Sequence, residues 1–532
     1  MRHTNKIQNK KSPKDPVAPK AAPRERNGLK MLADTPFFLL SWLLFTLFGA
    51  CVYGDVFYMC EQYGFFAFDR TLMQHLLDTP FGWYVYLGRM LLLSFKWPLL
   101  GALLWGGLLA LITRLTAYTF RLPARFKALS LLPAVGIVIT LLHKDLNLYY
   151  HGEPAFAFLL PLTVLFLLLL TATGRRLHTR FTRPAAPATQ PGLAVRIAQP
   201  LLLIATIACL SAGAFMFKEN VLLTARMQRL MQQQDWDSII ETALKAKTPS
   251  RPVAAYYAMA LVHTDGLNDR LFDIHYQYPR LNIRKNGQPD LGGELYQHDA
   301  NFHAGLIQTS YHNALEYQLM NGTSIDKLKR LFLCSLLSNE QSLAEKYLHI
   351  LRQVPFENAF CTNYAPILAD RSLLASDPEL SRVLELSPTE DAFEADFQAP
   401  LFLGYNVVRR TGRSSRALEA SLAACLYAKL VPAAVERAGS LGGRAPKSVE
   451  EAAAYYATQH PDMLKGSRFS PIILNRMQNF FNESRNLKAD KREKARLLKD
   501  NYHDFYPYYY FYENLPEADT PQQTQENKGS VN

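Results

Sequence analysis

The sequence predicts an all-α protein, in which an N-terminal bundle of about five transmembrane helices precedes an irregular tetratricopeptide-like helical-repeat domain, or α-solenoid. Three observations lead to this prediction. Five long apolar stretches lie within the first 217 of the 532 residues. The Lys and Arg content of the segments between these stretches alternates along the chain. After residue 217, apolar residues recur at helical spacing, and the period-two alternation of a half-buried strand is rare.

The chain begins with a basic tail, residues 1–34, that we predict to be disordered and cytoplasmic. It carries nine Lys or Arg side chains and is rich in Lys, Pro and Ala, a composition that cannot bury an apolar core. More than thirty residues precede the first apolar run, whereas a signal peptide has only a short basic segment there. At the other end, residues 513–532 are polar and are also predicted to be disordered.

Residues 35–217 form the predicted transmembrane domain. Each apolar stretch is close to the roughly 20 residues that a helix needs to cross a bilayer, and none contains Asp, Glu, Lys or Arg. A backbone in lipid must satisfy its own hydrogen bonds, so we predict helices. The spans lie at about 36–54, 97–113 with an extension from 84, 128–143, 154–174 and 197–217. The third span is the weakest because it is short and contains Pro133 and Gly136.

The charges between the spans predict the orientation of the chain. The segment before the first span, the third segment (114–127) and the fifth (175–196) are rich in Lys and Arg, whereas the second and fourth hold few. Lys and Arg concentrate on the cytoplasmic side of membrane proteins. We therefore expect a cytoplasmic N-terminus and, after five crossings, an extracytoplasmic helical-repeat domain at residues 218–512. In this interpretation, the basic residues behind the formal net charge of +12 set the orientation of the chain in the membrane and contact anionic lipid headgroups. No nucleic-acid partner is expected.

The loop between the first two spans is the one membrane-level segment with candidate catalytic residues. It is rich in aromatic side chains, which favour the membrane interface. Some multi-span enzymes that use lipid-linked sugars place a catalytic acid in their first outer loop, and a cation there can contact a lipid phosphate. The candidates are the acids Asp55, Glu61 and Asp69 and the bases Arg89 and Lys96. A structural alternative makes the same segment an amphipathic extension of the second span along the outer surface.

The C-terminal half predicts a series of helical hairpins. Asp235 is a suitable N-cap for a helix over 236–244, and the next helix follows at 254–262. Further amphipathic helices are predicted at 303–320, 326–337, 342–353, 416–430, 448–459 and 471–482. Two insertions interrupt them: a long loop over 277–301, which contains Gly292 and Gly293, and an acidic loop over 386–400. The pattern is poorest over 403–422, and no strict 34-residue period is present.

Several motifs, each of low specificity by itself, together resemble those of a known family. They are Trp236 with Ala243-Leu244, the segment Tyr256–Leu261, the segment Leu267–Phe272, Gly293–Tyr296 and the aromatic block Tyr502–Tyr512. On these residues the chain resembles an uncharacterised family of bacterial multi-span inner-membrane proteins with a C-terminal tetratricopeptide-like domain. The resemblance covers most of the chain and implies a multi-pass protein of the bacterial inner membrane with a periplasmic C-terminal domain. It implies no activity.

Other polar groups favour structural roles. His263, Asp265, Asp269, Asp273 and His275 lie close in sequence, followed by His298, Asp299 and His303, but no pair has the helical spacing of a metal site. The chain has no nucleophile motif and no phosphate-binding loop, so we expect no metal site, no cofactor-binding residues and no cofactor. Of the six cysteines, Cys334, Cys361 and Cys425 lie in the repeat domain; core packing is the preferred interpretation, with a Cys334–Cys361 disulfide as the alternative.

Two functional hypotheses follow. The first is a membrane-anchored helical-repeat protein that presents an extracytoplasmic interaction domain to an unknown protein or peptide partner, with the lipid bilayer as its second partner. The alternative is a membrane enzyme or transporter that acts on a lipid-linked or envelope substrate through the outer loop, residues 55–96. Ionisable residues inside the membrane usually mark function, and the span cores have none, so the first hypothesis is favoured. The aromatic block at Tyr502–Tyr512 is expected to close the last repeat, with membrane docking or ligand binding as alternatives.

Overall fold

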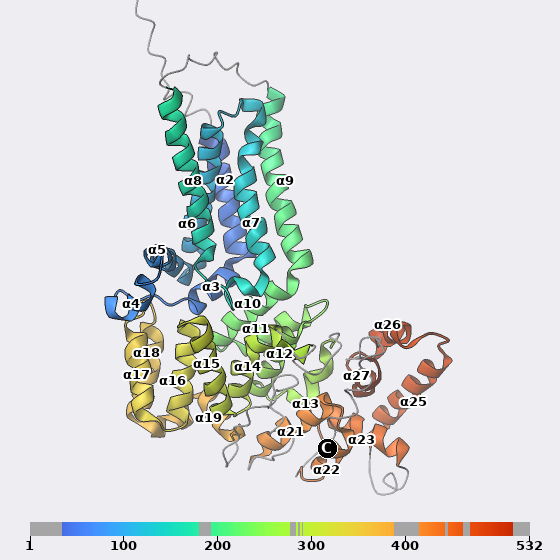
Figure 1. Ribbon diagram of the computed structural model, residues 1–532. Helices are drawn as coiled ribbons and strands as arrows, with labels where there is room; N and C mark the ends of the chain where they lie inside the picture. Colours follow the sequence, from blue (N-terminus) through green and yellow to red (C-terminus); the bar gives the residue numbers. More distant parts are fainter. Residues whose placement is uncertain are drawn as a thin grey trace, which may run out of the picture.

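The computed structural model describes residues 35–179, 193–276, 284–285, 288–289, 291–387, 414–441, 445–460 and 469–513. The predicted tail at 1–34, the predicted tail at 513–532 apart from residue 513, and most of the predicted loop at 386–400 lie outside these residues. The described chain is helical throughout, apart from a two-residue antiparallel pair, β1 (Arg284–Lys285) and β2 (Gln288–Pro289). A helical bundle stands on a larger helical half (Figure 1).

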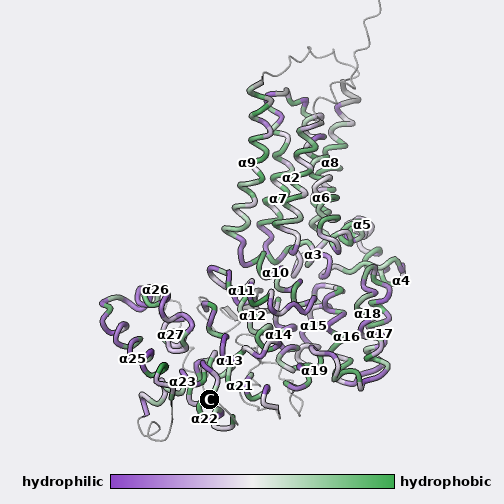
Figure 2. The backbone as a smooth tube through the Cα atoms, turned by 180° about the vertical axis from the view of Figure 1, so that it is seen from behind, coloured by the Kyte–Doolittle hydropathy of each residue, from purple (hydrophilic) through white to green (hydrophobic). Residues whose placement is uncertain are grey.

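Four helices are long and apolar enough to cross a membrane. Within the described residues they are the helix Pro98–Thr119, which is α6, and three further helical stretches. One of these contains α7 (Leu132–Lys144), and the other two, Phe156–Arg175 and Ile197–Phe217, lie within α8 (Phe156–Thr179) and α9 (Leu193–Phe217). The stretch that contains α7 runs from Arg125 to Leu148, longer than the predicted third span. A fifth span is formed if the stretch Pro36–Val52 and α3 (Gly54–Tyr63) count as one crossing, although they meet at an angle of 71°. The bundle is apolar along its length (Figure 2).

The first apolar stretch turns sharply at its end. It consists of α2 (Thr35–Leu47) and one turn of π-helix, η1 (Phe48–Val52), and the chain bends at Tyr53 into α3. Helix α3 lies at the base of the bundle, between the bundle and the helical half (Figure 1). Nine of its ten residues are buried, including Glu61 and Gln62, so polar side chains that lipid would exclude are packed in protein.

The helical path into the second span is interrupted, in contrast to the predicted continuous extension from residue 84. Two helices, α4 (Arg70–Leu77) and α5 (Gly82–Leu92), form a hairpin beside the base of the bundle. A short 3₁₀ helix, η2 (Leu93–Lys96), follows, and Pro98 begins α6. Proline disfavours helical backbone at the residue before it, and Trp97 is accordingly extended, with φ −111° and ψ 99°.

The helical half continues directly from α9. Its helices are α10 (Glu219–Gln232), α11 (Trp236–Leu244), α12 (Arg251–His263), α13 (Leu267–Arg270), α14 (Leu291–His303), α15 (Ile307–Asn321), α16 (Ile325–Leu337), α17 (Gln341–Arg352), α18 (Asn358–Ala369), α19 (Pro378–Leu386), α21 (Ser415–Tyr427), α22 (Val431–Ala438), α23 (Lys447–Gln459), α25 (Pro471–Asn486), α26 (Lys491–Tyr502) and α27 (Tyr506–Tyr512). From α14 to α18, each helix packs against the next in sequence (Figure 1). The predicted N-cap Asp235 is confirmed, because its carboxylate accepts a hydrogen bond from the amide of Ser238.

The predicted loop over 277–301 is wrong from residue 291 onward. Residues 291–303 form α14, which begins with Leu291 and has Gly292 and Gly293 in its first turn, a position where glycine costs little helix stability. The predicted single helix over 303–320 is also wrong at its start. The chain turns between α14 and α15 at Gly305, whose φ is +79°.

Gly305 is a position where a side chain would be costly. A Cβ atom there would lie 2.5 Å from the carbonyl carbon of Leu386 and 2.6 Å from the amide nitrogen of Ser387. We expect Gly305→Ala to destabilise the protein by more than about 2 kcal/mol, since left-handed strain and a backbone clash add together. Gly322→Ala is the control, because Gly322 also has a positive φ but no atom within 4 Å of the added Cβ. Equal losses in thermal unfolding midpoint for the two variants would contradict the clash.

The C-terminal aromatic block covers the core of the helical half. Pro507 lies in the first turn of α27, so the helix restarts there after a break at residues 503–505. Tyr506 and Tyr509 are fully buried, and the ring of Tyr509 lies 4.6 Å from that of Phe272. The block therefore packs inward. Cys334, Cys361 and Cys425 are buried free thiols, in agreement with core packing.

Candidate functional site

The five candidate residues of the outer loop all lie in the described part of the chain, and they do not converge on one cavity. Asp55 forms an ion pair with Arg229 of α10 at 2.8 Å. Asp69 caps α4 by accepting hydrogen bonds from the amide and the hydroxyl of Thr71. Arg89 forms a two-pronged pair with Glu153, at 3.0 and 2.7 Å. Asp55 and Arg89 therefore join separate segments of the chain, and Asp69 stabilises the start of its own helix.

Glu61 and Lys96, in contrast, meet in one buried group, which we call the Glu357 cluster: Glu61, Gln62, Lys96, Lys329 and Glu357. Glu357 is the residue immediately before α18 and is 2% exposed. Its carboxylate pairs with Lys96 at 2.5 Å and with Lys329 at 2.8 Å. Burial raises the pKa of the Glu357 carboxyl, but the two lysines outweigh burial and hold that pKa below its usual value. The group ties α3 and the entrance of α6 to the helical half.

A second polar group is centred on Lys327 of α16, which is 1% exposed. Its ammonium has three donors and three acceptors around it: Asp326 Oδ2 at 2.8 Å, His298 Nε2 at 2.6 Å and Tyr63 Oη at 3.0 Å. The ammonium also lies 4.3 Å from the ring centre of Tyr63 and 5.0 Å from that of Tyr317. Every donor of this buried cation therefore has a partner, as a charge without water requires.

The protonation states in this group follow from burial and charge. Burial lowers the pKa of His298, so its imidazole is neutral at pH 7. Lysine can only donate, and Nε2 of His298 therefore accepts while Nδ1 carries the proton. Burial alone would raise the pKa of Asp326, but the ammonium of Lys327 holds it well below its ordinary value. Asp326 is thus the carboxylate that balances the buried ammonium.

Arg330, one turn further along α16, extends the group. Its Nη2 donates to Oδ1 of Asp299 at 2.6 Å, and its guanidinium carbon lies 4.0 Å from the ring centre of Phe302. The other oxygen of Asp299 accepts a hydrogen bond from Tyr256 at 3.1 Å. Together these residues form the junction cluster: Tyr63, Tyr256, His298, Asp299, Tyr317, Asp326, Lys327 and Arg330. It joins α3 to α12, α14, α15 and α16.

The junction cluster was not predicted from the sequence, for identifiable reasons. His298 and Asp299 lay in a predicted loop, and charged residues on an amphipathic helix such as α16 are normally assigned to its solvent face. One signal was available: Leu295, Tyr296 and Phe302 have helical spacing around His298 and Asp299. A helical interpretation of that segment would have placed the imidazole and the carboxylate beside its buried face.

The polar residues considered as metal ligands are dispersed among other partners. His263 stacks on Trp236, with ring centres 4.0 Å apart, and its Nε2 lies 2.9 Å from Nδ1 of His303. Burial lowers the pKa of His263 to about 3. Asp265 pairs with Arg382, and His275 pairs with Glu513. Within the residues that the structure describes, no three His, Cys, Asp or Glu side chains are grouped to hold a metal ion.

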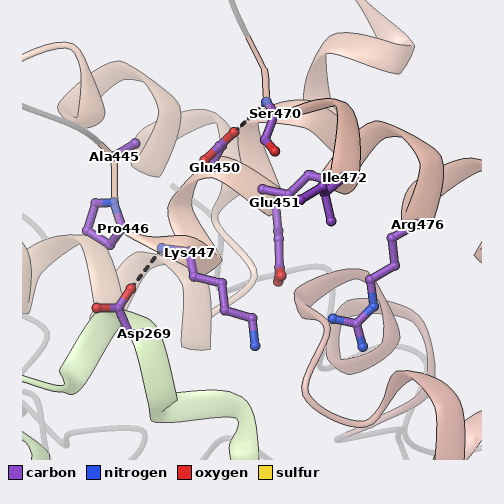
Figure 3. A pocket seen from close by; sticks show the side chains of 10 residues that line it. Asp269, Ala445, Pro446, Lys447, Glu450, Glu451, Ser470, Ile472 and Arg476 are labelled. Carbon is purple, nitrogen blue, oxygen red and sulfur yellow. Dashed lines mark hydrogen bonds between the residues drawn. The ribbon is translucent and has the colours of Figure 1, made fainter.

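An open pocket lies at the far end of the helical half, away from the bundle. It has a volume of about 550 Å³ and is formed between α13, α23 and α25 (Figure 3). Its lining residues are Asp269, Ala445, Pro446, Lys447, Glu450, Glu451, Ser470, Ile472, Ile473 and Arg476. The carboxylate of Glu451 points into the space between Lys447 and Arg476 (Figure 3).

The charges of the pocket do not cancel. Its two cations, Lys447 and Arg476, both pair with Asp504, at 2.8 and 2.5 Å. Three further carboxylates each bond a backbone amide with one oxygen: Asp269 to Lys447 at 2.9 Å, Glu450 to Ser470 at 2.7 Å and Glu451 to Tyr506 at 2.9 Å. Asp504 balances one of the two positive charges, and together with Asp269, Glu450 and Glu451 it gives the pocket four carboxylates against two cations.

Glu451 is the most buried of these acids, with 2% of its surface exposed. Burial raises its pKa to about 7, against the lowering effects of the Tyr506 amide, Lys447 and Arg476. Its charge at neutral pH is thus sensitive to whatever occupies the pocket. The junction cluster is closed and has its central cation fully bonded, so the pocket is the stronger candidate for binding a ligand.

Comparison with known proteins gives one match. The family described as "Family of unknown function (DUF6057)" matches residues 30–224 and 186–513. No curated protein and no solved structure matches the chain. The matched ranges contain both the apolar helices and the helical half, with the junction cluster and the pocket inside them. The chain therefore belongs to this family of unknown function.

Proposed function

We propose that the protein is a membrane-anchored helical-repeat protein whose C-terminal half binds an extracytoplasmic protein or peptide partner. In this proposal it is a multi-pass protein of the bacterial inner membrane, with a cytoplasmic N-terminus and a periplasmic helical domain. The alternation of Lys and Arg between the apolar stretches supports that orientation. The packing of α14 to α18, each helix against the next, supports an irregular tetratricopeptide-like solenoid.

The observation that carries the proposal is the acidic pocket between α13, α23 and α25. Asp269, Glu450 and Glu451 each use one carboxylate oxygen on a backbone amide, and the two cations of the lining are bonded to Asp504. The ligand chemistry that fits is a cation on an apolar stem. A Lys or Arg side chain of a partner segment has this form, because its charged end can reach the carboxylates while its methylene groups contact Ile472.

The pocket predicts selective binding of basic peptides by the full-length protein in nanodiscs. A fluorescent pentapeptide with one central lysine among alanines is expected to bind more tightly than its glutamate counterpart. Glu451→Gln should weaken lysine-peptide binding about tenfold, the equivalent of 1.4 kcal/mol, because a charged hydrogen bond becomes a neutral one. Fluorescence anisotropy measures both affinities.

The same assay has a pH signature. Because the pKa of Glu451 is raised to about 7, its carboxyl is largely protonated below pH 7 and charged above it. Affinity for the lysine peptide should therefore rise as the pH passes through 7, and this rise should be absent in Glu451→Gln. Glu345→Gln, a substitution at an exposed position on α17, is the matched control. Equal binding of the two peptides, or an unchanged affinity in Glu451→Gln, would refute the assignment of the pocket.

A second candidate function, a membrane enzyme or transporter for a lipid-linked or envelope substrate, is supported by one feature of the outer loop. Glu61 is buried, and its Oε1 atom has no hydrogen-bond partner although Lys96 and Glu357 are close. An acid of this kind at membrane level resembles a functional group more than a surface charge. Loss of a substrate-dependent activity in Glu61→Gln, with activity kept in Asp69→Asn, would favour this alternative.

A further inference from the structure

The helical half carries exposed apolar side chains on the edge that faces the bundle. Phe356 is 47% exposed, and Leu319 and Met320 are 78% and 79% exposed. Single apolar residues on a surface are ordinary. These three differ because their immediate neighbours bond to the ends of the candidate spans, which fixes their level along the bundle.

Phe356 lies at the entrance of the second span. It precedes Glu357 in the α17–α18 loop, and Glu357 is held by Lys96 at 2.5 Å. The ring of Phe356 packs edge-on against Trp97, with centres 4.7 Å apart, and Trp97 is the residue immediately before α6. Phe356 therefore stands at the same level as the end of α6.

Leu319 and Met320 lie near the start of another span. Tyr317, in the last turns of α15, donates a hydrogen bond to the carbonyl of Tyr150, and the side chain of Asn321 lies 3.5 Å from His151. Tyr150 and His151 shortly precede α8, which begins at Phe156. The C-terminal end of α15 is thus also at the level where a span meets the membrane surface.

The α4–α5 hairpin continues this apolar edge. Phe68, Phe81 and Trp83 are 72%, 75% and 65% exposed. Tyr84 donates to the carbonyl of Leu159 in α8, so α5 lies against a candidate span, while Met73 of α4 packs in the same apolar cluster as the α16–α18 helices. The hairpin lies beside the base of the bundle, above α17 and α18 (Figure 1).

We propose that this edge of the helical half, formed by Phe356, Leu319 and Met320 together with the α4–α5 hairpin, is embedded in the headgroup region of the phospholipid bilayer. This edge is continuous with the ends of the candidate spans, and that continuity identifies the lipid bilayer as what covers it. Large apolar and aromatic side chains gather at the level of the membrane interface, which is where aromatic residues are enriched in membrane proteins. The helical half is then a membrane-contacting body, held to lipid by its own loops as well as by the spans.

A photoreactive amino acid tests this contact. Benzoylphenylalanine is placed singly at Phe356 or Met320 in the full-length protein, which is reconstituted in phosphatidylcholine nanodiscs and irradiated. Mass spectrometry then measures the fraction of protein that carries a covalently bound lipid. Position Leu170, 52% exposed on α8, is the positive control, and Ile472, 77% exposed on α25, is the matched control on the helical half.

We expect lipid adducts at 356 and 320 with yields close to that at 170, and none at 472. Adducts at 170 alone would overturn the proposal, because the helical half would then stand clear of the bilayer. Crosslinks from 356 or 320 to a second copy of the chain in place of lipid would overturn it as well. Ile472 lines the acidic pocket, but the experiment contains no ligand of that pocket, so its result does not depend on the proposed function.

Discussion

Lys327→Met is expected to destabilise the helical half by about 3–5 kcal/mol, the cost typical of breaking a buried ion pair from one side. Asp326 would lose its counter-charge in a place with almost no water, and the acceptors on His298 and Tyr63 would lose the ammonium as a donor. Hydrogen–deuterium exchange of the full-length protein in nanodiscs measures this loss as faster exchange of the α14 and α16 amides.

Two further variants distinguish a broken pair from general damage. Lys346→Met, on the exposed face of α17, should change the free energy of opening that exchange measures by no more than about 0.5 kcal/mol. The double variant Asp326→Asn with Lys327→Met removes both charges and should be more stable than Lys327→Met alone. The reason is that the free-energy effects of substitutions at two interacting residues do not add. If the double variant were less stable by the sum of the two single losses, Lys327 and Asp326 would not act as a pair.

Much of the apolar bundle could be predicted from sequence, because long uncharged apolar stretches leave little choice of structure. A stretch of about 20 apolar residues without charge has few structural alternatives. The bend at Tyr53 could not be predicted in the same way. Its cause is that Glu61 and Gln62 have partners far away along the chain, such as Glu357, which is 295 residues from Gln62. Local composition contains no sign of a partner at that distance.

The two sites show a second limit. The helices α16 and α23 were predicted with nearly correct bounds, yet neither the junction cluster nor the pocket was found. A helix pattern separates polar from apolar faces, but it cannot distinguish a polar face in water from one packed against another polar face. Lys327 is buried only because α3 and α14 cover it, and Glu451 only because Tyr506, 55 residues later, returns to it. Such sites arise from tertiary packing.

The Glu357 cluster makes a prediction about how firmly the two halves are joined. Glu357→Gln keeps the shape of the side chain but leaves Lys96 and Lys329 without a carboxylate partner, at 2.5 and 2.8 Å from a neutral amide. We expect a loss of about 3 kcal/mol and a lower thermal unfolding midpoint for the detergent-solubilised protein. Glu241→Gln is the control, because the Glu241–Lys245 pair on α11 is largely exposed and should contribute about 0.5 kcal/mol or less.

The pH dependence of this contact follows from its pKa. Since the pKa of folded Glu357 is held below its ordinary value of 4.5, the folded state binds its proton less readily than the unfolded state does. The stabilisation is therefore complete above about pH 4.5 and is lost as the pH falls through the folded pKa. The wild type should lose more stability than Glu357→Gln between pH 6 and the acid range, so their unfolding midpoints should converge on acidification. A constant difference between the two proteins across that range would show that the carboxylate charge of Glu357 is not what joins the entrance of α6 to α16.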